Sequence, residues 1–215
     1  MNTARRRAGF KLLGIALALA AAGSPAFAHD EDHDGPRGGH VFTSSNNTSD
    51  NQLLVYTRDA SGALTLAAAV STQGQGTGAG LGSQGAVTRS GDGRYVFVVN
   101  AASNTVSTFR IHGDRVSLAS VVDSGGLHPI SVTESDGMVA VLNAGGAGNV
   151  AGFRNLHGTL APLAGATRGL SAAGGTGPAQ VGFGEDGEVL LVTEKATNLL
   201  TSYRVGSDGS FGQPI

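Results

Sequence analysis

Few residues in this chain could do chemistry, and three of them stand out by type and position. Glu194 and Lys195 are adjacent charged residues directly after the apolar run 189–192, and His128 directly precedes Pro129. A carboxylate or an imidazole can take a proton from water, and an ammonium group can stabilise the negative oxygen that forms when water attacks a carbonyl. Glu194 or His128 is therefore a candidate general base, and Lys195 a candidate for holding the oxyanion or a substrate carboxylate.

Each of these residues also has a structural interpretation. Glu194 and Lys195 could simply form a solvated turn after a strand, and His128 could serve only to set the backbone before a proline. A second polar set could bind substrate, but asparagine also closes tight turns through bonds to its own backbone. That set consists of Gln84, Asn100, Asn143, Gln180 and Asn198.

The elements that must position these residues repeat along the chain. Asp-Gly pairs stand at 92–93, 136–137 and 186–187, and each is followed by an apolar run and then by a run with an aromatic residue beside arginine. An earlier copy, 41–43 followed by 54–58, fits the same pattern. A period of about 40–50 residues built only from strands and tight turns is typical of a β-propeller blade. The fold class is therefore predicted to be all-β.

Each blade is predicted to contain four strands, and the first copy to lack its innermost strand. The predicted strands lie at 85–88, 95–100, 106–111 and 116–122, then at 129–133, 138–142, 150–154 and 160–164, and finally at 179–183, 189–192 and 199–205 with a stub of a fourth. This gives about 3.5–4 blades, whereas propellers close with about 4–8. The alternatives are a four-bladed ring, an arc completed by a partner, and a truncated chain, which the stop within a blade favours. Open blade edges predict self-association.

The N-terminus is predicted to be a signal peptide spanning residues 1–28. Basic residues at 5–7 and Lys11 precede the apolar stretch 12–22, and Ala-Phe-Ala at 26–28 is a cleavage motif. The alternative is an uncleaved membrane anchor, but the apolar stretch is short for a membrane span. The sequence thus predicts an exported protein, periplasmic or secreted. A flexible leader rich in histidine and acidic residues, 29–40, would precede the propeller, 41–215.

Composition argues against several classes of partner. Residues 1–28 hold four of the 14 basic residues and none of the 16 acidic ones, so the mature chain has 10 basic against 16 acidic residues and a net charge of −6. An acidic exported protein is a poor candidate for binding nucleic acid or an anionic membrane. The chain has no cysteine, so it forms no disulfides although its predicted compartment would permit them.

Two further motifs are weak indications of a cofactor or a metal. Gly80, Gly82 and Gly85 have G-x-G-x-x-G spacing, but the motif runs into a predicted strand rather than a helix, which argues against dinucleotide binding. We expect the glycine-rich tract to be a long connection instead. The histidine and acidic residues at 29–34 could bind metal only adventitiously, as flexible tails do. No cofactor and no metal site are predicted.

The order of these motifs resembles the lactonase-type β-propeller family, which includes 6-phosphogluconolactonase-like and 3-carboxymuconate cyclase-like proteins. The resemblance covers nearly all of residues 41–215 and rests on segments 80–111, 128–132, 141–154 and 175–198. Members of this family usually form a seven-bladed ring. The resemblance therefore implies that the chain corresponds to the first half of such a ring or slightly more.

The resemblance also implies a function, an exported lactonase-like protein that hydrolyses or closes a lactone without a metal and binds a small lactone or carboxylate. In enzymes of this family a histidine follows a proline at the start of an inner strand. Here Ala179 follows Pro178, and His128 precedes rather than follows Pro129. This departure supports the alternative of a non-catalytic propeller that binds a protein or glycan partner through its polar face.

Overall fold

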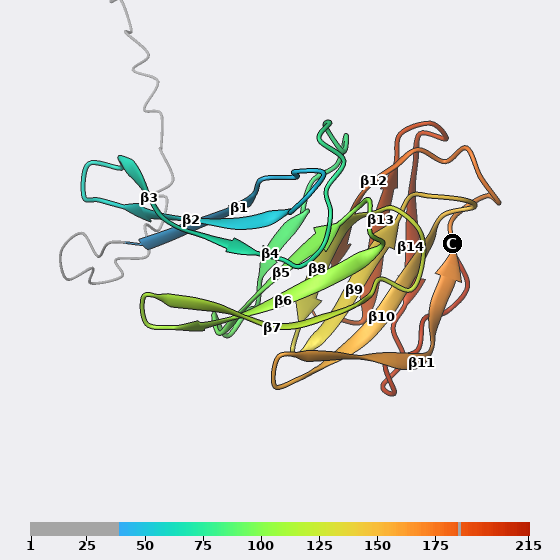
Figure 1. Cartoon of the computed structure of the whole chain (residues 1–215). Coiled ribbons are helices and arrows are strands. Elements are labelled where there is room, and N and C mark those ends of the chain that lie inside the picture. The colour runs from blue at the N-terminus through green and yellow to red at the C-terminus, as the bar shows by residue number, and fades with distance from the viewer. Residues whose placement is uncertain (1–38, 185) are drawn as a thin grey trace, which may run out of the picture. The chain divides into compact units, whose positions relative to one another are not determined.

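The computed structural model describes residues 39–184 and 186–215, so the predicted signal peptide and residues 29–38 of the predicted leader lie outside the described part. The regular structure of the described residues consists entirely of β-strands, which form four antiparallel sheets (Figure 1). No helix in these two ranges is long and apolar enough to cross a membrane. The predicted all-β, partial propeller is thus confirmed.

The sheets follow one another along the chain, and the strands within each sheet pair in sequence order. The first sheet contains β1 (Gly39–Ser44), β2 (Gln52–Arg58) and β3 (Leu64–Ser71). The second contains β4 (Val87–Arg89), β5 (Tyr95–Asn100), β6 (Thr105–His112) and β7 (Arg115–Asp123). The third contains β8 (Pro129–Ser135), β9 (Met138–Asn143), β10 (Asn149–Leu156) and β11 (Thr159–Gly169), and the fourth contains β12 (Pro178–Phe183), β13 (Val189–Glu194) and β14 (Leu199–Arg204).

The Asp-Gly pairs of the repeat form the tight turns between the first two strands of the second, third and fourth sheets. Gly93, Gly137 and Gly187 have φ values of 73°, 77° and 69°. This left-handed backbone costs glycine little because glycine has no Cβ. The repeat spacing visible in the sequence is therefore the spacing of these hairpins.

Apart from the end of β11, the strand bounds lie within two residues of the predicted ones. β1 begins at Gly39, inside the predicted leader. β11 runs on to Gly169 instead of ending near residue 164, because a bulge between Ala151 and Phe153 lets its pairing with β10 resume at Thr167. The predicted stub of a last strand is present, since Ile215 exchanges two backbone hydrogen bonds with β14.

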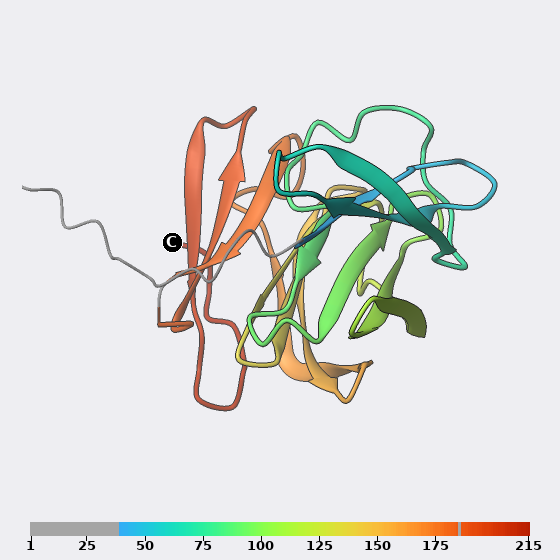
Figure 2. The same cartoon turned by 90° about the vertical axis from the view of Figure 1, so that its left-hand side faces the viewer.

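The core lies between successive sheets, and the aromatic residue of each repeat anchors it. Phe109, Phe153 and Tyr203 are fully buried, each among side chains of its own sheet and of the preceding sheet. Burying a side chain of this size contributes roughly 1.5–3 kcal/mol. Figures 1 and 2 show the first sheet (blue to teal) and the fourth (orange to red) at the two ends of the series.

Candidate functional site

The predicted site residues come from one end of the sheets, which we call the site face. In the second, third and fourth sheets it carries the entry loop that leads into the first strand and the corner that joins the second and third strands. In the first sheet it carries the corner between β1 and β2, where Asn51 bonds to Asn100. Asn100, Asn143 and Glu194 end β5, β9 and β13 and share one register position, because each lies opposite the first residue of the following strand. All three side chains are buried. Glu194 is thus the counterpart of two asparagines in the repeat.

The Glu194 carboxylate is fully engaged inside the protein. It accepts hydrogen bonds from the Ser171 N–H (3.0 Å), the Ser171 hydroxyl, the Thr197 hydroxyl (2.9 Å) and the Thr201 hydroxyl (2.8 Å). Burial raises the pKa of this carboxyl, but the hydrogen bonds from Ser171, Thr201 and Thr197 outweigh burial and leave the pKa below its ordinary value. Glu194 therefore ties the entry loop of the fourth sheet to its corner and to β14.

Asn100 and Asn143 also hold neighbouring segments rather than facing solvent. The Asn100 side chain donates to the Ser107 hydroxyl (2.8 Å) and accepts from Asn51 of the first sheet (2.9 Å). The Asn143 side chain donates to the Ser124 carbonyl in the entry loop of its own sheet (3.1 Å). These contacts are structural, but they join distant segments and are not the bonds to their own turns by which asparagines were expected to act.

The remaining predicted substrate-binding residues lie elsewhere on the site face. Asn198 has a φ of 56°, close to the 59° of Asn104 at the same position of the second sheet, so it is a left-handed turn residue. Gln84 and Gln180 are exposed and do not line the pocket beside His128 described below. The site face thus does not bring the predicted set together.

His128 has an unusual backbone and contributes its side chain to a pocket. Its φ is 55°, whereas the extended conformation was expected for a residue before proline. The backbone holds this geometry because the His128 N–H donates to the Asn104 side chain (2.7 Å) and its carbonyl accepts from the Ala144 N–H (3.0 Å). Non-glycine residues with positive φ are uncommon and are often found at functional sites.

The pocket beside His128 has a volume of about 230 Å³. Its walls come from the inner strands and loops of the third and fourth sheets, with Leu81 contributed by the long connection 72–86. Among the described lining residues His128 is the one ionisable side chain, and no carboxylate is present. The lining consists of Leu81, His128, Ile130, Ala144, Gly146, Ala147 and residues 175–178.

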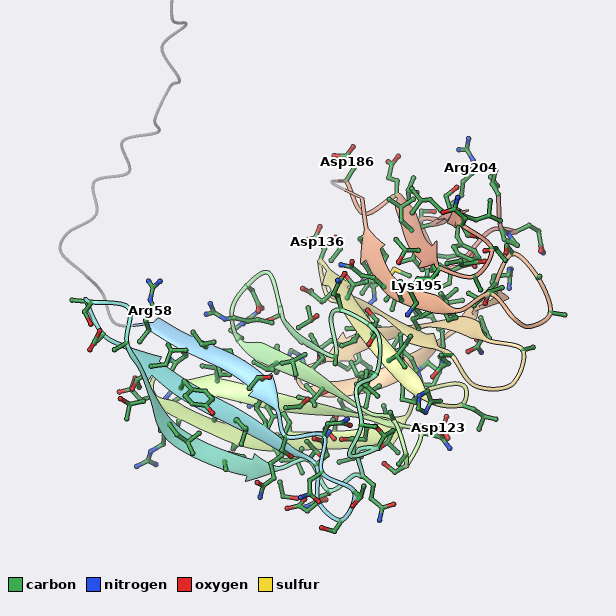
Figure 3. The ribbon with its side chains drawn as sticks, turned by 90° about the horizontal axis from the view of Figure 1, so that it is seen from above. Arg58, Asp123, Asp136, Asp186, Lys195 and Arg204 are labelled. Atoms are coloured by element: carbon green, nitrogen blue, oxygen red, sulfur yellow. The ribbon has the colours of Figure 1, made fainter. Side chains whose placement is uncertain are left out.

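Lys195 directly follows β13 and is exposed, and Figure 3 labels it beside the strands of the fourth sheet. It is not a lining residue of the pocket, but it is hydrogen-bonded to two segments that adjoin the lining. Its backbone N–H donates to the carbonyl of Gly177, a lining residue (2.9 Å), and its ammonium donates to the carbonyl of Gly82, next to Leu81 (2.5 Å). Within the described ranges no carboxylate forms an ion pair with Lys195. An ammonium group has three protons, so two remain for a ligand. His128 thus lines the pocket and Lys195 is bonded to segments that adjoin it, whereas the Glu194 carboxylate is occupied by internal hydrogen bonds.

The long connection 72–86 contributes Leu81 to the pocket wall, because it passes over the innermost strands of the third and fourth sheets, β8 and β12. Ser83 donates its hydroxyl to the Ile130 carbonyl (2.8 Å), and the Gln84 N–H donates to the Ala179 carbonyl (3.1 Å). The expected long connection is therefore present, without the helix that dinucleotide binding would need. Pro129 and Pro178 begin the innermost strands of the third and fourth sheets, β8 and β12. They are followed by Ile130 and Ala179, so neither strand has a histidine after its proline.

Sequence reasoning did not identify most of the pocket wall. Leu81, the corner 144–147 and the entry loop 175–177 are small or apolar residues without chemical signature. Their only signal in the sequence was a high density of glycine, which permits close approach of loops but does not indicate which loops meet.

Comparisons with known proteins agree with this architecture. The family model described as "Lactonase, 7-bladed beta-propeller" matches residues 47–155. The periplasmic gluconolactonase of Pseudomonas aeruginosa is a similar solved structure, with a TM-score of 0.53 and 17% identity over 86% of this chain and 67% of that one. A Bacteroides fragilis protein that carries the provisional name 6-phosphogluconolactonase has a TM-score of 0.55 and 18% identity over 87% of this chain and 56% of that one.

These identities indicate a shared fold. The chain spans 56% and 67% of the lengths of these two structures. Comparison with curated protein sequences finds no match.

Proposed function

Since the chain belongs to the lactonase family of seven-bladed β-propellers, we propose that it binds a small lactone in the pocket beside His128 and opens the ring by hydrolysis. One observation carries the proposal. The pocket has a single ionisable lining residue, His128, and an ammonium group bonded to segments that adjoin it, Lys195, with no carboxylate among the described lining residues. This arrangement suits a ligand that is neutral when it enters and negative when it leaves.

In the proposed reaction His128 acts as the base. The neutral imidazole takes a proton from water, and the water oxygen forms a bond to the lactone carbonyl carbon. The carbonyl oxygen becomes an oxyanion, and the ring C–O bond then breaks as the carbonyl re-forms. The leaving alkoxide takes the proton back from the imidazolium, so one lactone and one water give one hydroxy acid.

Lys195 and backbone N–H groups would stabilise the oxyanion. The Lys195 ammonium has two protons beyond the one it gives to Gly82. Among the described residues, the N–H groups of Gly146 and Ala147 in the pocket wall have no hydrogen-bond acceptor. A donor that points at a developing oxyanion is typically worth about 100-fold or more in rate.

The first test is whether the chain opens lactones at all, and it comes with a prediction for Lys195. Hydrolysis of γ- and δ-lactones of sugar acids by the full chain is followed by pH-stat titration above the spontaneous rate. The Lys195→Gln variant is expected to lose about 100-fold in kcat/KM, because it lacks the positive charge beside the oxyanion. Arg115→Gln, which removes an exposed cation from β7 in the second sheet, is the matched control and should leave kcat/KM unchanged. Equal rates for both variants would remove Lys195 from the mechanism.

A second candidate function is a propeller that binds a hydroxy acid, a glycan or a protein without turnover. It is favoured by Ala179, which follows Pro178 at the position where the resemblance implies a histidine in the family's enzymes. Saturable binding of a sugar acid with no lactone hydrolysis above the spontaneous rate would support this candidate over the enzyme.

We also propose that the protein is exported. The basic residues, apolar stretch and Ala-Phe-Ala motif of residues 1–28 support this, and a similar solved structure is named as periplasmic. The expected mature protein begins at His29. Intact-mass measurement of protein recovered from the periplasm or medium checks this, and a protein that retains residue 1 and stays in the cytoplasm would refute it.

A further inference from the structure

A second pocket lies at the opposite end of the strands from the site face, between the second and third sheets, and we call it the turn pocket. Its volume is about 400 Å³, within the range of about 300–1,000 Å³ that is typical of small-molecule sites. Its lining residues lie within 90–95, 134–137 and 155–157, which form the turns β4–β5, β8–β9 and β10–β11. Figure 3 labels Asp136 at the tip of the turn β8–β9. The two sheets are neighbours in the chain, so this pocket needs no wall from any other sheet.

Hydrogen bonds between the two sheets hold the walls of the turn pocket in place. The Glu134 carboxylate accepts from the Gly91 N–H of the second sheet (2.8 Å) and from the Gly137 N–H of its own sheet (2.6 Å). The Arg110 guanidinium of the second sheet donates to the His157 carbonyl of the third (2.6 Å). The walls are therefore tied together before any ligand binds, which lowers the entropy cost of binding.

A buried hydroxyl in the lining lacks a partner. Tyr95 lines the turn pocket and is only 9% exposed. Its ring extends across to the third sheet, since a Cβ at Gly158 would lie 3.2 Å from the Tyr95 Cε1 atom. Its hydroxyl forms no hydrogen bond with any residue that the structure describes. A phenol hydroxyl can both donate and accept, and leaving one unpaired at this depth costs free energy, so it is suited to bond to a ligand.

Three other lining side chains offer unused polar groups of both kinds. Among the described residues no donor bonds to the Asp136 carboxylate, and the Asn155 side chain uses only its oxygen, which accepts from the Gly158 N–H (2.8 Å). Arg94 uses only its Nε atom, which donates to Asp92 (2.6 Å). A carboxylate has two acceptor oxygens and a guanidinium has two terminal NH₂ groups, so each can bond to two neighbouring hydroxyls.

The charges around the turn pocket balance. Three carboxylates belong to its wall, and three guanidinium groups belong to the wall or bond to its backbone. These are Asp92, Glu134 and Asp136, against Arg94, Arg110 and Arg154. The described ranges contain no group of three or more histidine or acidic side chains placed to hold a metal ion. A balanced wall of this kind does not select a metal ion or an anion by net charge.

We propose that the turn pocket binds one ring of a neutral saccharide. A sugar ring is uncharged and carries several neighbouring hydroxyls, each of which donates and accepts, as the wall requires. In this complex the Tyr95 hydroxyl and the Asp136 carboxylate bond to sugar hydroxyls. The turn pocket shares no residue with the pocket beside His128, so the proposal does not depend on the proposed function.

The test follows the amide resonances of the ¹⁵N-labelled full chain during titration with D-glucose, D-galactose, D-mannose and N-acetyl-D-glucosamine. Each is used as the free sugar and as its methyl glycoside, and none contains a lactone or a carboxylate. We expect at least one sugar to shift the resonances of Gly91, Gly137 and His157 in a saturable way. Equal affinity for the methyl glycoside would identify the end of a glycan chain as the ligand, and binding of the free sugar alone would identify a free monosaccharide.

Two conservative variants assign the binding to the turn pocket. Tyr95→Phe should weaken binding by about 3- to 10-fold, the contribution of one hydrogen bond between neutral groups. Asp136→Asn should weaken it by about 10-fold or more, because bonds to a charged group are stronger. Tyr56→Phe in the first sheet and Asp114→Asn, whose side chain is 99% exposed in the turn β6–β7, are the matched controls and should bind as the wild type does. His128→Asn should also leave binding unchanged.

Three results would overturn the proposal. One is the absence of a saturable shift with all eight probes, and another is wild-type affinity in both Tyr95→Phe and Asp136→Asn. The third is a loss of binding in His128→Asn but not in Tyr95→Phe, which would place the sugar in the pocket beside His128. Urea unfolding shows that a loss of affinity is not a loss of folding. Both variants should keep wild-type stability, because neither side chain has a hydrogen-bond partner among the described residues and asparagine tolerates the φ of 47° at residue 136.

Discussion

Replacing Glu194 with alanine is expected to destabilise the chain by about 3 kcal/mol. The substitution removes a buried carboxylate that accepts four hydrogen bonds, and bonds to a charged group contribute about 1.5–3 kcal/mol each before relaxation of the loop. It also leaves the Ser171 N–H and two threonine hydroxyls without their acceptor. Urea unfolding measures the effect, with Glu188→Ala as control because Glu188 is exposed in the preceding turn and should change stability by less than about 0.5 kcal/mol.

The same carboxylate predicts a specific pH dependence. Because the pKa of Glu194 is lower in the folded than in the unfolded chain, its stabilisation is fully present above the ordinary glutamate pKa of about 4.3. That stabilisation is lost as the pH falls through the lower, folded-state pKa. The difference in unfolding free energy between wild type and Glu194→Gln should therefore be constant near neutral pH and shrink below about pH 4.

A loss of activity without a loss of stability on replacing Glu194 would restore this residue as the general base. A Glu194→Gln protein with wild-type stability at neutral pH and no lactone hydrolysis would show that the carboxylate acts on substrate. The four donors around it make us expect instead a less stable protein that retains turnover where it stays folded.

Replacing His128 with asparagine is expected to lower kcat for lactone hydrolysis by about 10²- to 10⁴-fold, the usual contribution of a general base. Asparagine is the right replacement because it tolerates a positive φ, which is 55° at this position. Stability should therefore change little, and the loss should lie in kcat rather than in folding. Initial rates at saturating lactone, together with urea unfolding, measure both quantities.

The chain offers a matched control for this variant. His157 has the same φ of 55° and lies in the turn between β10 and β11, at the opposite end of the strands from the pocket. His157→Asn makes the same chemical change in the same backbone geometry and should keep full activity. Equal losses in both variants, or none in either, would contradict a catalytic role for His128.

The fold could be predicted from the sequence because its signals are local. Asp-Gly turns, apolar runs and the aromatic anchors at Phe109, Phe153 and Tyr203 each depend on residues close together in the chain. Strand ends were less predictable. The bulge between Ala151 and Phe153, which lengthens β11, depends on pairing between strands rather than on either strand's own sequence.

The site was less predictable because it depends on contacts between distant segments. Glutamate is a residue type that often acts in catalysis, so Glu194 was a natural candidate. Only its alignment with Asn100 and Asn143 in the repeat indicates a structural role. Lys195 bonds to Gly82, which adjoins the pocket lining and lies 113 residues earlier in the chain. No local pattern encodes which loops converge, so that contact could not be derived from spacing.

The most direct test of the central claim, that the ligand binds between His128 and Lys195, uses Lys195 as a reporter. It is the only lysine beyond Lys11, so incorporation of lysine with ¹³C at Cε reports on one side chain in the propeller and leaves the charge and all three ammonium protons in place. On addition of gluconate, the hydroxy acid of a simple sugar lactone, the ¹³Cε resonance of Lys195 should shift and saturate. A resonance that stays unchanged while the same sample hydrolyses the lactone would place the site elsewhere and contradict the account.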